Sequence, residues 1–125
     1  MPEILVEGNI NKEFCEKAIH FFCDALGIEP PNLHVFTDET IVPNGACYQN
    51  ADDEYMIVLN EHGNEPMMTT LAHELTHVKQ YLLDDLAGCF DTSIPYMNRW
   101  WEKEAYIKEV EMTKLIIEAT EKGEI

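Results

Sequence analysis

Five consecutive residues, His73-Glu74-Leu75-Thr76-His77, carry the side chains of a metal site. On a helix, residues four apart lie on the same face, about one turn from each other. Two imidazoles placed in this way can bind one Zn²⁺, and the carboxylate between them can activate the water that the metal holds. The motif therefore predicts zinc ligands at His73 and His77 and a general base at Glu74. The alternative is a pair of surface histidines on an amphipathic helix.

A catalytic zinc site normally has a third protein ligand, and residues 100–106 supply two candidates. At 100° per residue, the predicted helix there has an apolar sector formed by Trp101, Ala105, Met112, Ile116 and Ala119, extended by Tyr106, Val110 and Ile117. Glu102 falls inside this sector, whereas Glu104 falls on the polar side. Because a carboxylate on a buried face is costly without a metal or a partner, Glu102 is the predicted third ligand and Glu104 the alternative.

Four further residues are candidates for supporting roles. Tyr96 and Tyr106 could each donate a hydrogen bond to a developing oxyanion, or simply pack beside the two tryptophans. Glu109 shares the face of Glu102 and could support the site or pair with a lysine. His62, in the turn before the motif, is either a fourth ligand or an exposed side chain.

The helices and strands that must position these residues are predicted from hydrophobic periodicity and from the residues that typically begin and end such elements. A first helix is predicted over 11–26, capped by Asn11 and ended by Gly27. Short strands are predicted over 33–36, 46–49 and 55–60, and a turn at 43–45 precedes the strand over 46–49. The motif helix runs from about Pro66, as its first residue, to Leu83. A loop over 88–95 and a long helix over 98–121 complete the chain.

This order predicts one α+β domain over residues 1–125. Its small three-stranded sheet, antiparallel or mixed, is expected to be covered on one face. The motif helix has an apolar stripe formed by Met67, Leu71, Leu75, Val78 and Leu82. Strand 55–60 is the expected sheet edge for an extended substrate.

The charge balance excludes two classes of partner. With 24 acidic residues against 8 basic ones, the net charge is −16. Nucleic acids and anionic membranes need clusters of lysine and arginine, so neither is expected. No signal peptide is recognisable, which predicts an intracellular, cytoplasmic protein, or one of the host cytoplasm or virion if a phage encodes it. The four cysteines lack metal-binding spacing and are expected to be reduced thiols.

The motif and residues 102–106, Glu-Lys-Glu-Ala-Tyr, together resemble the zincin metallopeptidases of gluzincin type. Several gluzincin families have a Glu-x-Glu-Ala-Asp/Asn segment whose first glutamate binds zinc, which matches Glu102; they have Asp or Asn where this chain has Tyr106. In its short length and in these two segments, the chain resembles minimal gluzincin-like proteins of phages and bacteria and, more distantly, SprT-like and ImmA/IrrE-like proteins.

The resemblance covers about residues 55–110 and implies a compact zincin-like domain. It also implies a zinc-dependent peptidase that acts on a peptide or protein substrate. The alternative function is a non-proteolytic, metal-binding protein on the same scaffold, such as a phage accessory or virion-associated protein.

Overall fold

The computed structural model describes residues 2–39 and 44–125. Pro43, part of the turn predicted before the second strand, lies outside these residues. The strands are β1 (Ile4–Glu7), β2 (Asn32–Asp38), β3 (Gly45–Ala51) and β4 (Glu54–Asn60). The helices are α1 (Lys12–Leu26), α2 (Met67–Leu83), the short α3 (Leu86–Cys89) and α4 (Trp100–Glu121), with a 3₁₀ turn at Tyr96–Asn98 before α4. The predicted α+β class is confirmed.

The sheet has four strands in the order β1-β2-β4-β3, so the prediction of three strands was wrong. The missed strand is β1, which has four residues, too few for a clear alternation of apolar and polar side chains. The β1–β2 and β2–β4 pairs are parallel and the β3–β4 pair is antiparallel, which makes the sheet mixed. Strand β4 lies between β2 and β3, and therefore cannot offer the free edge expected of it. The edge next to α2 belongs to β3.

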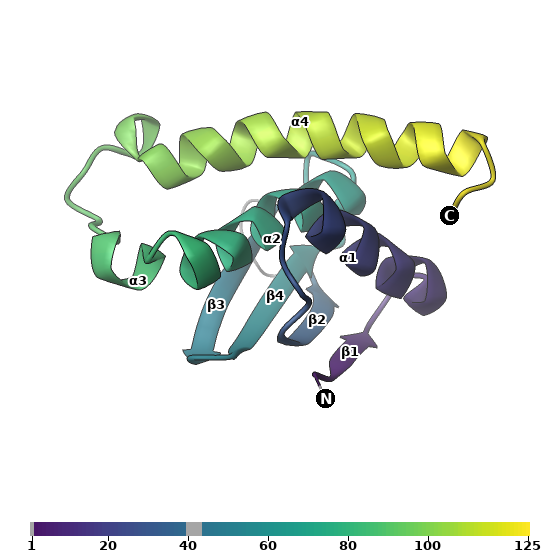
Figure 1. The fold of residues 1–125 in the computed structure, drawn as a ribbon, viewed down its shortest axis with the longest axis horizontal. Helices are drawn as coiled ribbons and strands as arrows, with labels where there is room; N and C mark the ends of the chain where they lie inside the picture. Colours follow the sequence, from purple (N-terminus) through teal and green to yellow (C-terminus); the bar gives the residue numbers. More distant parts are fainter. Residues whose placement is uncertain (1, 40–43) are drawn as a thin grey trace.

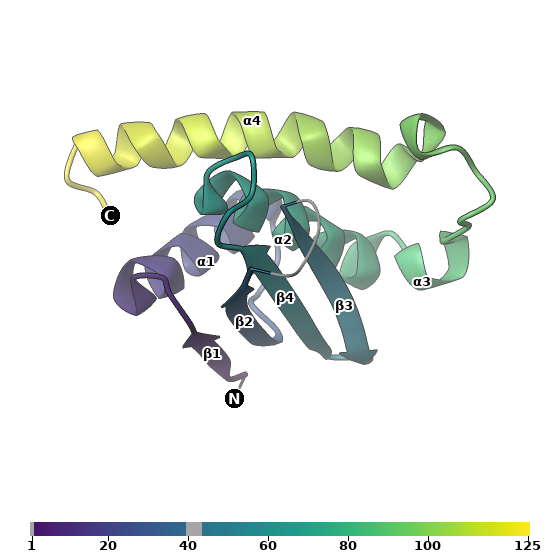
Figure 2. The same ribbon diagram turned by 180° about the vertical axis from the view of Figure 1, so that it is seen from behind.

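All helices lie on the same face of the sheet (Figures 1 and 2). The arrangement has three layers: the sheet, then α1 and α2, then α4 across the outside of α2. The core lies between sheet and helices and includes Val35, Ile57 and Leu59 from the strands and Phe22 and Leu71 from the helices. Among the described residues, no helix is both long enough and apolar enough to cross a membrane.

Helix α1 begins and ends as its sequence predicts. The side chain of Asn11 accepts a hydrogen bond from the backbone N–H of Phe14, and Gly27 ends the helix with a φ of 76°. Helix α2 differs at its start, because Pro66 is the residue before the first helical turn rather than the first residue in it. The predicted loop over 88–95 is helical at its beginning, where α3 continues to Cys89.

The buried sector of α4 is narrower than predicted. Trp101, Ala105, Met112, Ile116 and Ala119 are all buried, as expected. Tyr106, Val110 and Ile117, predicted to extend this sector, are 48%, 68% and 52% exposed. Helix α4 packs on α2 and α1 from one side only, so side chains flanking the central stripe remain in contact with solvent. On α2, Leu71, Leu75 and Val78 are buried, but Leu82 is 37% exposed.

Candidate metal centre

The two histidines of the motif lie on the face of α2 that α4 covers. His73, Glu74 and His77 are each 7% exposed, and their ligand atoms lie within 4.8 Å of one another. Leu71, Leu75 and Val78 hold the same helix against the core. The four-residue spacing thus gives the predicted result, with both imidazoles directed to one place.

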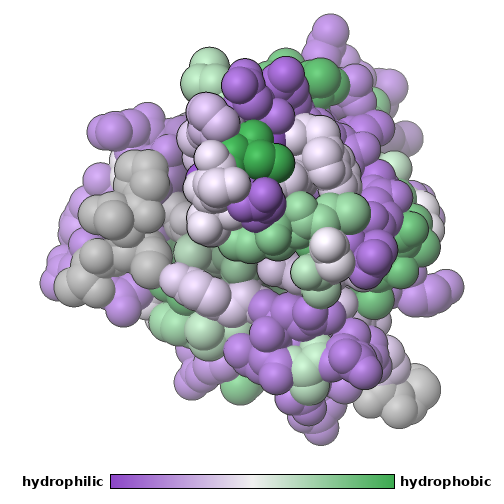
Figure 3. Space-filling view, turned by 90° about the vertical axis from the view of Figure 1, so that its left-hand side faces the viewer, coloured by the Kyte–Doolittle hydropathy of each residue, from purple (hydrophilic) through white to green (hydrophobic). Residues whose placement is uncertain are grey.

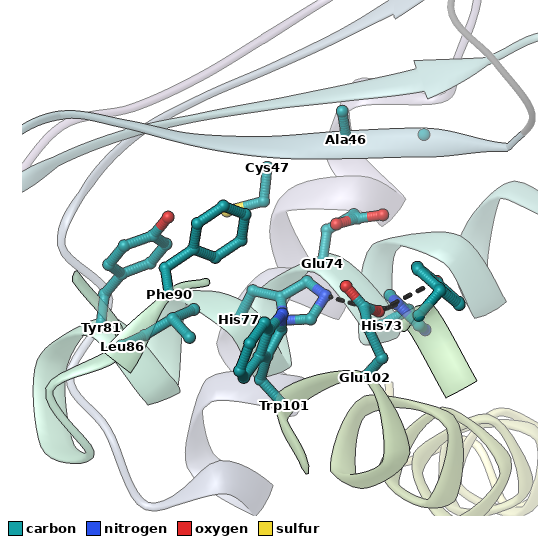
Figure 4. Close-up of a pocket in the computed structure, with 12 residues that line it drawn as sticks. Ala46, Cys47, His73, Glu74, His77, Tyr81, Leu86, Phe90, Trp101 and Glu102 are labelled. Carbon is teal, nitrogen blue, oxygen red and sulfur yellow. Dashed lines mark hydrogen bonds and ion pairs between the residues drawn. The ribbon is translucent and has the colours of Figure 1, made fainter. Parts of the chain in front are cut away.

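Glu102 reaches this place from the first turn of α4. Its Oε1 atom lies 3.0 Å from Nε2 of His73 and 3.2 Å from Nε2 of His77 (Figure 4). Glu104 points elsewhere, because its carboxylate accepts hydrogen bonds from Nζ of Lys79 and Nε2 of Gln80. The structure therefore brings Glu102 to the two histidines and leaves Glu104 outside.

The Nδ1 atom of each imidazole, on the side of the ring away from Glu102, lies within hydrogen-bond distance of a buried side-chain oxygen. The Nδ1 of His73 lies 2.8 Å from Oε1 of the buried Glu109, and Nδ1 of His77 lies 2.8 Å from Oε1 of the buried Gln80. Because each of these oxygens accepts a hydrogen bond, Nδ1 carries the proton and the lone pair of the neutral ring is at Nε2. Both Nε2 atoms face Glu102, so the rings are oriented for a shared ligand at this point.

Gln80 was missed by the sequence argument. Its Nε2 donates to the Trp101 carbonyl at 2.9 Å and to Oε1 of Glu104 at 2.9 Å, which fixes the amide that holds His77. The available signal was spacing, since Gln80 follows His77 by three residues and so shares its face of α2. Glu109, which was predicted either to support the site or to pair with a lysine, contacts His73.

Charges around the histidines set their protonation in the absence of a metal. Burial opposes a charge on His73, but hydrogen bonds to Glu102 and Glu109 and the nearby carboxylate of Glu74 raise its pKa to about 9. Burial likewise opposes a charge on His77, and Glu102 and Glu74 raise its pKa in the same way. The pKa of Glu102 is lowered, because its hydrogen bonds to both histidines outweigh its burial.

The Glu74 carboxyl is buried beside the two histidines. Burial raises the pKa of its carboxyl, and the two histidines counteract part of this effect. A general base near neutral pH needs a carboxyl pKa above the ordinary value for glutamate. No hydrogen bond within the described residues commits the Glu74 carboxylate to a structural partner that would hold it away from the cleft.

Tyr96 and Tyr106 lie at the outer side of Glu102. The hydroxyl of Tyr96 donates to Oε1 of Glu102 at 3.1 Å and lies 3.1 Å from the hydroxyl of Tyr106. The Tyr106 ring packs edge-on against His73, with 4.8 Å between ring centroids. Burial and the neighbouring Tyr106 and Glu102 raise the pKa of Tyr96, so this phenol stays protonated and remains a donor. His62 lies apart from this group and pairs with Glu39.

His73, Glu74, His77, Tyr96 and Glu102 line a cleft of about 310 Å³. Gly45, Ala46 and Cys47 of β3 form one wall, and the other residues of Figure 4 form the floor and the opposite wall. At Gly45 the strand comes so close to α2 that a Cβ atom there would lie 2.7 Å from Cγ2 of Thr70 and 3.7 Å from Oε2 of Glu74. Glycine at this position therefore lets the edge strand lie directly beside Glu74.

One end of the cleft is polar and the other is apolar. Tyr81, Leu86, Phe90 and Trp101 form the apolar end, in which Trp101 lies beside His77 and the other three lie on the far side of His77 from Glu102 (Figure 4). The indole Nε1 of Trp101 is buried without a hydrogen-bond partner among the described residues. Figure 3 shows the end of the molecule that carries α3 and β3, where hydrophobic residues lie between more hydrophilic ones.

The donor set fits zinc. Two imidazole nitrogens and one carboxylate oxygen are the protein ligands of a common catalytic type of zinc site, and each histidine already has the outer partner that such ligands need. Cys47 also lines the cleft, and burial and the nearby Glu74 raise the pKa of its thiol well above the ordinary value. Comparison of the chain with protein families, with curated proteins and with solved structures finds no match.

Proposed function

We propose that this protein is a zinc-dependent metallopeptidase in which His73, His77 and Glu102 hold the metal and Glu74 is the general base. One observation carries the proposal. Oε1 of Glu102 lies 3.0 and 3.2 Å from the Nε2 atoms of the two histidines, and the buried carboxylate of Glu74 lies beside them without a hydrogen bond to any of the three among the described residues. A metal held only for structure needs no neighbouring base. The presence of Glu74 therefore favours a hydrolytic enzyme over the non-proteolytic, metal-binding alternative.

The bound zinc would supply Lewis-acid chemistry, polarising the scissile carbonyl and lowering the pKa of a water molecule. Glu74 accepts a proton from the attacking water as the new C–O bond forms at the carbonyl carbon. It then delivers this proton to the amide nitrogen as the C–N bond breaks, so that the leaving group departs as an amine. The phenols of Tyr96 and Tyr106, which lie beside Glu102, are the candidate side-chain donors for the developing oxyanion.

Among the described residues, β3 is an edge strand of the sheet, and its outer edge is suited to an extended peptide. Its other edge pairs with β4, and Gly45 to Cys47 line the cleft beside Glu74. A peptide that adds to this edge would form main-chain hydrogen bonds and turn alternate side chains into the cleft. The apolar end formed by Tyr81, Leu86, Phe90 and Trp101 would then accept an apolar side chain next to the scissile bond.

The test is to measure bound metal and cleavage together. We expect about one zinc per chain in the purified protein, cleavage of a broad peptide library, and loss of cleavage when a chelator removes the zinc. Added zinc should restore the activity. Protein without zinc, and unable to bind it when zinc is supplied, would contradict the proposal. Zinc binding without any cleavage would favour the non-proteolytic alternative.

Glu109 offers a prediction about metal affinity. Its carboxylate holds Nδ1 of His73, so Glu109→Ala, which removes the acceptor, should weaken zinc binding about 10- to 100-fold, the usual effect of losing an outer partner of a ligating histidine. Competition with a chromophoric chelator measures this. Glu111→Ala is the matched control, because it makes the same change in a side chain of α4 that is 57% exposed and forms a surface ion pair with Lys108. Equal affinities for the two variants would show that Glu109 has no role in orienting His73.

A further inference from the structure

The face of the sheet opposite the helices carries an unusual set of side chains. The strand residues that point to the helices are buried in the core, among them Val6, Val35 and Ile57. Side chains alternate along a strand, so their neighbours in sequence point to the other face. No helix of the described residues covers that face (Figures 1 and 2). We call it the open face.

Strand register places two rows of side chains across the centre of the open face. In the first row, Leu5 lies opposite His34, His34 opposite Met56 and Met56 opposite Tyr48. The second row consists of Glu7, Phe36, Val58 and Ala46, and its Val58 is only 4% exposed, so this row offers little apolar surface to a partner. Leu5 is 52% exposed and Tyr48 is 44% exposed. Aromatic residues and methionine are the types that are enriched in protein interfaces.

The ends of the open face are acidic. At one end lie Asp52, Asp53 and Glu54, which form the turn between β3 and β4 and the start of β4, and all three are exposed. At the other end lie Asp38, Glu39 and Glu61, at the ends of β2 and β4. No lysine or arginine occurs between Lys17 and Lys79, so none of β2, β3 and β4 carries a positive side chain, and β1 has none either. The nearby histidines of this surface already pair with acids, His34 with Glu7 and His62 with Glu39.

We propose that the open face binds a basic polypeptide segment that also carries apolar side chains. Leu5, Met56 and Tyr48 of the first row provide apolar surface for a partner to bury, and the acidic ends provide complementary charge and direct the approach of a cationic partner. The same charges disfavour nucleic acids and anionic lipids. They also disfavour a second copy of this chain, which would bring identical acidic ends and a further net charge of −16. None of the first-row residues lines the cleft, so the inference does not depend on the proposed peptidase activity.

The test uses a short fluorescent peptide of alternating lysine and leucine, with the Glu74→Gln protein to prevent cleavage. Anisotropy should show binding that the double substitution Leu5→Ser, Tyr48→Ser weakens at least about tenfold, as expected when central apolar contacts are lost. The matched control is Ile107→Ser, Val110→Ser, which removes exposed apolar side chains from α4 and should leave the affinity unchanged. Thermal unfolding monitored by circular dichroism checks that both double variants are folded.

Charge is tested on both partners. A peptide of alternating glutamate and leucine should fail to bind, and Asp52→Asn with Asp53→Asn should weaken binding of the lysine peptide and reduce its dependence on salt. Three results would overturn the proposal. These are equal binding of the glutamate peptide, an affinity that Leu5→Ser with Tyr48→Ser does not change, and self-association in sedimentation that this double variant abolishes. The last result would assign the open face to a second copy.

Discussion

Replacing Glu74 with glutamine should lower kcat for peptide hydrolysis by about 10²- to 10⁴-fold, the range that general acid–base catalysis contributes. Glutamine keeps the size and shape of glutamate but cannot accept and return a proton. Glu74 is 7% exposed and lies between the two histidines along α2, so the substitution preserves packing and removes one buried charge. Loss of the negative charge should also lower the pKa of both histidines, since Glu74 is among the groups that raise them. Zinc should therefore remain bound.

The measurement has two parts, and both are necessary. Zinc per chain should be equal in wild type and Glu74→Gln, while the rate of cleavage differs. The control is Glu65→Gln, a carboxylate near the start of α2 that accepts a hydrogen bond from Thr70 and should affect activity far less. A Glu74→Gln variant that binds zinc and retains full activity would exclude Glu74 as the base. Another group would then have to remove the proton from the water.

The sequence predicted those parts of the site that lie on single helices. A four-residue spacing determines how His73 and His77 lie relative to each other, whatever packs against α2. Helical phase also separated Glu102 from Glu104, because the five residues that set the buried sector of α4 are buried as expected. Phase overestimated the width of this sector, since it contains no information about how much of α4 its neighbours cover. Tyr106, Val110 and Ile117 are exposed for this reason.

Contacts between distant segments were harder to predict. Which strand forms the edge beside the motif helix depends on strand order, and order is not encoded in the alternation of apolar and polar residues. The most apolar strand, β4, is apolar because it is paired on both sides and lies inside the sheet. It was therefore a poor choice for a substrate edge. The less apolar β3, with only partly buried or exposed residues, forms the edge.

Glu102→Gln should weaken zinc binding more than loss of the Glu109 carboxylate, for which a decrease of about 10- to 100-fold is expected. The reason is that Glu102 is itself a proposed metal ligand, whereas Glu109 only orients the ligand His73. The substitution keeps the side chain's volume and still offers Tyr96 an acceptor for its hydrogen bond. What it removes is the anionic oxygen that lies 3.0 and 3.2 Å from the two imidazole nitrogens. A neutral amide is a much poorer zinc ligand than a carboxylate.

Glu104→Gln is the variant to compare with Glu102→Gln, because Glu104 was the alternative candidate for the third ligand. This variant loses ion pairing with Lys79 and changes the group that accepts from Gln80, yet it leaves every atom that faces the histidines in place. Its zinc affinity, measured by the same chelator competition, should fall less than that of Glu102→Gln. A larger loss in Glu104→Gln would mean that the first turn of α4 rotates when the metal binds, exchanging the two glutamates. Since Trp101 and Ala105 are buried on the face that such a rotation would expose, we expect the order Glu102, then Glu109, then Glu104.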